Sequence, residues 1–168
     1  MKKSNIGFTL IELIIVIAVI SILAAIAFVA VNPAKRIGDA NNDQRWADIT
    51  AVAEAWQKAT VDSNGLTPSS TVEEGVVYAI AIGSGQTFDG NLCEAEEDDV
   101  PVVTTAMIDL TSLTDDGYLG LLPVEPTDNV AFVAGGQTGY YFVRPSNNII
   151  KVGACETYGE DEEIFVTR

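Results

Sequence analysis

The stretch Gly7-Phe8-Thr9-Leu10-Ile11-Glu12, followed by an apolar run from Leu13 to Val31, decides how this chain is organised. The run contains 19 residues without a charge, and Ser21 is its only polar residue. A helix rises about 1.5 Å per residue, so a helix of about 19 to 24 residues spans the hydrocarbon layer of a bilayer, which is about 30 Å thick. The run therefore predicts a helix that can cross a membrane.

The charges around the apolar run predict its orientation. Lys2 and Lys3 precede the run, and acidic residues follow it in excess. The positive-inside rule then places the N-terminus in the cytoplasm and the rest of the chain outside. A cleaved secretory signal is an alternative, but its apolar stretch is usually only about 7 to 15 residues long.

A plain single-pass anchor is a second alternative, and it explains the length of the run but not Glu12. A carboxylate deep in a bilayer costs about 2.5 to 3.5 kcal/mol on insertion scales, although near the surface it can reach water. The position of Glu12 near the start of the run therefore points to a partner for its charge.

A short basic leader, the stretch from Gly7 to Glu12 and an apolar helix follow one another in an order that resembles the prepilin peptidase motif of type IV pilins and type II secretion pseudopilins. The resemblance covers residues 1 to about 60. It implies cleavage between Gly7 and Phe8 by prepilin peptidase, and N-methylation of Phe8. It also implies that Glu12 lies opposite the N-terminal amine of a neighbouring subunit, with Thr9 beside the same contact. Since an unpaired buried carboxylate is costly, this pair would set the register between subunits.

Four segments are expected along the chain. They are a leader peptide at residues 1–7, a transmembrane and filament-core helix at 8–31, an amphipathic helix half at 32–62, and an exported β-rich body at 63–168. Pro33 predicts a kink or a locally melted stretch at residues 29–33, because proline removes a backbone donor and clashes with the preceding turn. Two separate helices with a loop at Asn32-Pro33 are the alternative.

The amphipathic half is predicted from apolar residues that recur at helical spacing through a polar sequence. An ion pair between Arg45 and Asp48 is expected on its surface, and a helix end is expected near residues 62–65, where Asn and Gly favour a C-terminal stop. The apolar stripe consists of Ile37, Ala40, Trp46, Ile49, Val52, Ala53, Trp56 and Ala59.

The remaining residues predict a small antiparallel sheet, so the fold class is α+β, with the long helix packed on that sheet. Short β-branched or aromatic runs separated by turn residues predict the strands, and residues 144–148 are typical of a hairpin connection. A short helix is expected at residues 107–113. The strands are expected at residues 76–82, 129–133, 140–143 and 149–152, with an edge strand at 164–166.

Residues 120–126, followed by Tyr140 and Tyr141, are similar to the tail of many bacterial pilins and major pseudopilins. Those tails often have a Leu-Pro-x-Asp-Pro turn before a tyrosine-bearing strand. Here Glu125 takes the place of the usual aspartate, which leaves the side-chain bonding of the turn open.

The two cysteines, Cys93 and Cys155, lie 62 positions apart. If the body is exported, a disulfide between them is the expected state. Closing a loop of this size stabilises a fold by about 4 kcal/mol in the chain-entropy model. A pair of reduced, buried thiols is the alternative.

The charge and composition argue against several classes of function. The net charge of −15, from 24 acidic and 9 basic residues, disfavours direct binding to nucleic acid. Histidine is absent, and neither a nucleophile elbow nor a phosphate loop is present, so we assign no catalytic residue, no metal ligand and no enzyme activity. The acidic runs at 94–99 and 160–163 favour solvated loops and no cofactor, with calcium binding as the alternative.

Together these features predict a structural subunit of an extracellular type IV pilus filament, polymerised through its N-terminal helix. The expected partners are identical subunits in a helical filament, prepilin peptidase and the pilus assembly machinery. The chain is expected in the inner (cytoplasmic) membrane before assembly, with its body outside, and in the extracellular pilus afterwards. A major pseudopilin of a type II secretion system is the alternative. A binding module on an uncleaved membrane anchor is a third reading.

Overall fold

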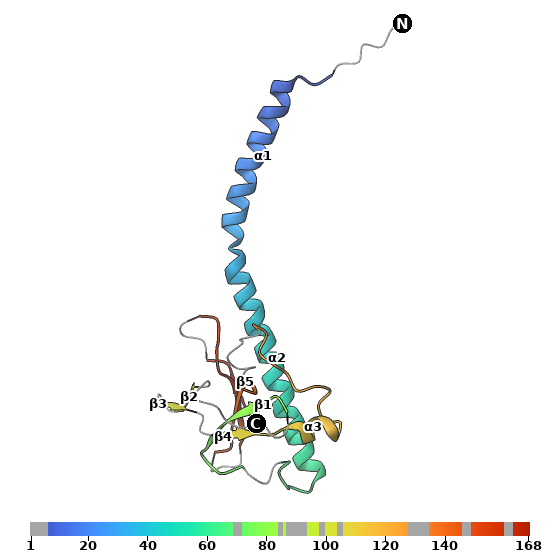
Figure 1. Ribbon diagram of the computed structural model, residues 1–168, viewed down its shortest axis with the longest axis vertical. Coiled ribbons are helices and arrows are strands. Elements are labelled where there is room, and N and C mark those ends of the chain that lie inside the picture. Colours follow the sequence, from blue (N-terminus) through green and yellow to red (C-terminus); the bar gives the residue numbers. More distant parts are fainter. Residues whose placement is uncertain are drawn as a thin grey trace. The chain divides into compact units, whose positions relative to one another are not determined.

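The computed structural model describes residues 7–68, 72–83, 86, 94–97, 100–103, 106–127, 135–145, 149–159 and 163–168. The chain divides into two units, Met1–Gly38 and Asp39–Arg168, which are described one at a time. Figure 1 shows the elements and their order along the chain.

The first unit contains helix α1 (Leu10–Val31) and the beginning of helix α2 (Pro33–Asp62), and Asn32 separates the two helices. Asn32 has φ 44° and ψ 73°, the left-handed conformation that asparagine tolerates better than most residues. Its side-chain oxygen accepts from the Lys35 amide at 3.5 Å, and Pro33 occupies the first helical position, where proline needs no donor. The interruption falls within the predicted stretch 29–33, but it is a single residue and no loop.

The second unit is built on the rest of α2 and a five-stranded sheet with the strand order β4-β1-β5-β6-β7. The strand β1 pairs parallel with β4, and the other neighbours are antiparallel. A separate antiparallel pair is formed by β2 and β3. The strands are β1 (Val77–Ala81), β2 (Glu94–Glu97), β3 (Val100–Val103), β4 (Ala106–Ile108), β5 (Gln137–Val143), β6 (Lys151–Ala154) and β7 (Phe165–Thr167), and a short helix α3 spans Thr111–Asp115.

One face of α2 and one face of the sheet share the hydrophobic core, which confirms the α+β layout of a long helix and a mostly antiparallel sheet. The rings of Trp56 and Phe142 meet with their centroids 4.6 Å apart. The predicted stripe holds for the second part of α2 but is wrong for its beginning, since Ile37, Ala40 and Trp46 are exposed. The buried stripe residues are Ile49, Val52, Ala53, Trp56 and Ala59, and they pack with Ile80, Ile108, Leu113, Tyr140 and Val152.

The end of α2 confirms the stop predicted near residues 62–65. Asn64 and Gly65 have φ values of 56° and 88°, and the Gly65 amide donates to the Thr60 carbonyl oxygen at 2.8 Å. This left-handed ending satisfies carbonyl groups that a helix otherwise leaves without a partner.

Several predicted strands are confirmed. Residues 76–82, 140–143 and 149–152 correspond to β1, β5 and β6, and residues 164–166 correspond to the edge strand β7. The strand expected at 129–133 lies outside the described residues, as do positions 146–148 of the expected hairpin connection.

Two expectations for the body are wrong. The segment 107–113 is no continuous helix, because Ala106–Ile108 joins the sheet as β4, parallel to β1. The Asp109 carboxylate then accepts from the amide and the hydroxyl of Thr111, and α3 begins there. The acidic run at 94–99 is no simple loop either, since the backbone of Glu94–Glu97 pairs with β3. The pairing of β4 with β1 is non-local, and β2 pairs with the strand that follows it directly, so the partner strand overrides the local sequence pattern in both cases.

A buried ion pair replaces the expected contact between Arg45 and Asp48. One guanidinium nitrogen of Arg45 donates to the Glu125 carboxylate, and another donates to the Asn42 side chain at 2.7 Å. The second Glu125 oxygen accepts from the amide of Thr127 at 3.0 Å and from its hydroxyl. The Arg45 and Glu125 side chains are only 3% and 1% exposed. Glu125 therefore holds the turn at residues 120–126 against α2 through its ion pair with Arg45.

Asp48 pairs with the sheet, since its carboxylate accepts from the Tyr140 hydroxyl at 2.6 Å. Burial raises the pKa of Asp48 above its ordinary value of 3.8, against the smaller, opposing effect of this hydrogen bond. The folded body therefore binds the Asp48 proton more tightly than the unfolded chain does, and its stability falls as pH rises from 3.8 through the raised pKa.

We expect Asp48→Asn to flatten this part of the pH dependence, because asparagine keeps an acceptor for Tyr140 but carries no charge. In the fragment 34–168, which lacks α1, the melting temperature of Asp48→Asn should then exceed that of the wild type by more near pH 7 than near pH 4. Tyr140→Phe serves as the control and should steepen the fall, since it removes the hydrogen bond that lowers the pKa of Asp48. Equal differences between Asp48→Asn and wild type at both pH values would contradict the expectation.

Candidate processing and assembly site

The residues from Gly7 to Glu12 lead into α1, which begins at Leu10, and carry the predicted processing and assembly functions. Thr9 is the N-cap, with an extended backbone at φ −79° and ψ 153°. Its hydroxyl accepts from the Glu12 amide at 3.3 Å, and the Glu12 carboxylate accepts from the Thr9 amide and hydroxyl, each at 2.8 Å. This reciprocal capping box is what a Thr-x-x-Glu sequence before an apolar run favours.

The Gly7–Phe8 peptide bond lies just before this cap, in a segment without helical structure. The Phe8 side chain is 85% exposed. A Cβ built on Gly7 would have no described atom within 4 Å apart from its neighbours in the chain, so the described fold imposes no local requirement for glycine there. Any requirement for a small residue at this position must therefore come from a partner that reads the segment.

Helix α1 is apolar on all sides and has no buried residue. Its 22 residues correspond to about 33 Å of helix, close to the thickness of bilayer hydrocarbon. The hydroxyl of Ser21, its only polar side chain after Glu12, donates to the Ile17 carbonyl oxygen at 2.7 Å. The described residues include one helical stretch, Leu10–Asp62, that is long and apolar enough to cross a membrane. An apolar helix of this kind fits a membrane anchor.

Among the predicted site residues, the structure brings Thr9 and Glu12 into contact and leaves Gly7 and Phe8 exposed beside them. Cys155 follows β6 and packs on a small cluster of Val77, Tyr141 and Val143 on the other face of the sheet from Phe142. Cys93 lies outside the described residues, so its pairing with Cys155 stays a prediction.

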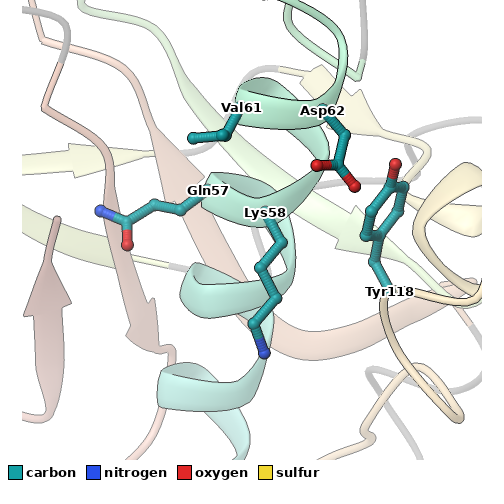
Figure 2. Close-up of a pocket in the computed structure, with 5 residues that line it drawn as sticks. All are labelled: Gln57, Lys58, Val61, Asp62 and Tyr118. Carbon is teal, nitrogen blue, oxygen red and sulfur yellow. The ribbon is translucent and has the colours of Figure 1, made fainter.

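A surface pocket of about 390 Å³ lies on the body, at the end of α2 (Figure 2). Asp62 and Tyr118 face one another across it, and partial burial together with a hydrogen bond to Asp62 raises the pKa of Tyr118. Its lining residues are Gln57, Lys58, Val61, Asp62 and Tyr118. No described contact assigns any of these side chains a catalytic role.

The part of the chain that the structure describes contains no group of three or more His, Cys, Asp or Glu side chains that could hold a metal ion. The calcium alternative rests on residues 94–99 and 160–163, of which only the Glu163 side chain is described. That alternative therefore stays a prediction.

Comparison with known proteins bears on the N-terminal segment. Residues 2–28 match the family model described as the prokaryotic N-terminal methylation motif. This motif is the signature of type IV pilins and pseudopilins, and it implies processing by prepilin peptidase. No curated protein and no solved structure matches the chain.

Proposed function

We propose that this chain, which carries the type IV pilin and pseudopilin signature, is the structural subunit of an extracellular type IV pilus and no enzyme. Prepilin peptidase removes residues 1–7, Phe8 becomes the methylated N-terminus, and the pilus assembly machinery polymerises the subunits through α1. The chain resides in the inner membrane, with its body outside, until it enters the filament.

The observation that best supports the proposal is the exposure of the apolar helix α1. Every residue of this apolar helix is exposed in the single chain, which is far more apolar surface than a soluble monomer tolerates. Lipid covers such a helix before assembly, and copies of the same helix cover it in a filament. A filament also gives Glu12 a partner, because the amine of Phe8 in a neighbouring copy carries the opposite charge.

The acidic body suits the outside of such a filament. The chain carries 24 acidic residues, and surface charge of one sign keeps assemblies soluble. A disulfide between Cys93 and Cys155 would form in the oxidising environment outside the membrane and would stabilise the body there.

The alternative is a major pseudopilin of a type II secretion system, because both classes share the processing motif. Electron microscopy of sheared surface material, with peptide mapping, separates the two readings. Long surface filaments that contain this chain support the pilus. Their absence, combined with calcium-dependent stabilisation of the fragment 34–168, supports the pseudopilin.

The processing step is tested by mass spectrometry of the mature chain with variants of Gly7. Wild type and Gly7→Ala should begin at methylated Phe8, whereas Gly7→Phe should keep the leader. Because a Cβ on Gly7 would meet no described residue beyond its neighbours in the chain, a failure of Gly7→Phe is expected to report on the peptidase and not on folding. An intact Met1 on the wild-type protein would contradict both the pilus and the pseudopilin.

A further inference from the structure

The few basic residues of this acidic chain are distributed unevenly. Two of the nine lie in the leader, and several of the others have partners in the body. Arg45 is buried against Glu125, Lys58 lies 4.0 Å from Glu54, and the Lys151 ammonium lies 4.4 Å from the centre of the Phe165 ring. These cations are therefore engaged within the chain.

Lys35 and Arg36 differ from these residues. Both side chains are exposed at the beginning of α2, directly beyond the apolar helix. The Arg36 guanidinium donates to the Val31 carbonyl oxygen at 3.3 Å, and within the described residues neither cation forms an ion pair. Two positive charges thus lie just beyond the end of α1, and no salt bridge to them is formed by the described residues.

Asp39 and Asp43 follow one and two turns later on α2. Both are exposed, and neither forms an ion pair with the described part of the chain. Within one helix, a cation four residues before an acid is the less favourable order for a salt bridge. The start of α2 therefore presents cations and acids in succession that the described residues do not pair.

The spacing of these charges matches the register of the proposed filament, so this step rests on the proposed function. If Glu12 of one copy lies level with the Phe8 amine of its neighbour, the two copies are offset by about 6 to 8 Å, because Phe8 and Thr9 precede the first helical residue, Leu10. Copies in a helical filament keep the same axial offset at every position. In α2 the same offset brings Lys35 of the neighbour level with Asp39 of the first copy.

The direction of the offset is the same for the contact at Glu12 and for the contact at Asp39. The copy that presents Glu12 also presents Asp39, and the copy that presents the Phe8 amine also presents Lys35. A longer offset of about 10 Å, or seven residues, brings Arg36 level with Asp43 instead. At each of these two offsets, a cation of one copy lies level with an acid of the other.

We propose that Lys35 forms an ion pair with Asp39 of a neighbouring copy, as a second register contact beyond the apolar helix. The occupant of this surface is a second copy of the chain, because the same helix offers the complementary charges at the matching spacing. The highly acidic bodies otherwise repel one another, so opposed cations at this level also favour close approach.

A charge swap in the full-length chain tests this contact, in cells that carry the processing and assembly machinery. We expect Lys35→Glu and Asp39→Lys each to lower the yield of sheared filaments by about 10-fold, because like charges then face one another. The double variant should recover to within about 3-fold of wild type. Lys58→Glu, which makes the same charge change elsewhere on α2, should leave the yield unchanged.

The processed chain in the membrane is measured in parallel. Depletion of this pool by Lys35→Glu, without recovery in the double variant, would show contact with anionic lipid headgroups and overturn the proposal. A double variant no better than its weaker parent would overturn it as well. Wild-type cells without filaments would instead refute the proposed function itself.

A crosslink supplies the second measurement. Copies with Lys35→Cys and copies with Asp39→Cys are expressed together, and the filaments are oxidised under mild conditions. A dimer that joins the two kinds of copy is expected, whereas Lys35→Cys combined with Lys58→Cys should give none. Filaments that form without the first dimer would contradict the proposed contact.

Discussion

Replacing Glu12 with valine is expected to leave cleavage of the leader intact and to lower the yield of surface filaments by at least about 10-fold. The charge of Glu12 is the part of α1 that distinguishes one axial register from another, since the rest of the helix is uniformly apolar. Valine makes every register acceptable, and the amine of Phe8 in the neighbour loses its counter-charge. The measurement is an immunoblot of sheared filaments against the processed chain that remains in the membrane.

A matched variant separates the charge of Glu12 from its role in the helix cap. Glu12→Gln keeps an acceptor for the Thr9 amide, and glutamine also serves in capping boxes. If the charge sets the register, Glu12→Gln fails like Glu12→Val, while Thr9→Val, which loses the hydroxyl but keeps the charge, retains most of the filaments. Normal filaments from Glu12→Val would refute the register role.

The capping box shows how the Glu12 carboxylate is held within the single chain, which the sequence resemblance did not indicate. In the single chain the Glu12 carboxylate already accepts two hydrogen bonds from Thr9. These bonds make the charge more tolerable at the membrane surface before a neighbouring subunit arrives. In the proposed filament, the amine of another copy would then meet a carboxylate that its own helix has oriented.

The elements that the sequence predicted well are those whose signals are local. The apolar run fixed α1, and Asn64 with Gly65 ended α2 at the expected place. The cap at Thr9 was available from the same reasoning, because Thr-x-x-Glu before an apolar run is itself a signature of a helix start. The strands β1, β5 and β6 were found because β-branched and aromatic runs were bounded by turn residues.

The elements that the sequence did not predict depend on distant partners. Residues 106–108 become a strand because β1 offers a parallel edge, about 25 residues earlier in the chain. Arg45 was assigned to Asp48 because reasoning from helix spacing considers only neighbours at three or four positions. Its real partner, Glu125, is 80 residues away. The sequence could not separate a pilus from a pseudopilus for a different reason, because subunits of both carry the same N-terminal motif.

The ion pair between Arg45 and Glu125 also supports the second large effect. Glu125→Leu is expected to lower the free energy of unfolding of the fragment 34–168 by about 3 to 5 kcal/mol, because it leaves the buried Arg45 without a counter-charge. Urea unfolding followed by tryptophan fluorescence measures this change, since Trp56 lies in the core beside Phe142. Glu125→Leu also removes the acceptor for Thr127 and loosens the turn from α2.

The double variant Arg45→Met with Glu125→Leu decides whether charge or shape explains this loss. A buried ion pair repays only part of its own desolvation, so removing both charges is often close to neutral. We therefore expect the double variant to regain most of the stability that Glu125→Leu loses. If Glu125→Leu alone stays within about 0.5 kcal/mol of wild type, the pair does not hold the turn to the helix. If the double variant is as unstable as Glu125→Leu, the hydrogen bonds to Asn42 and Thr127 matter more than the charge.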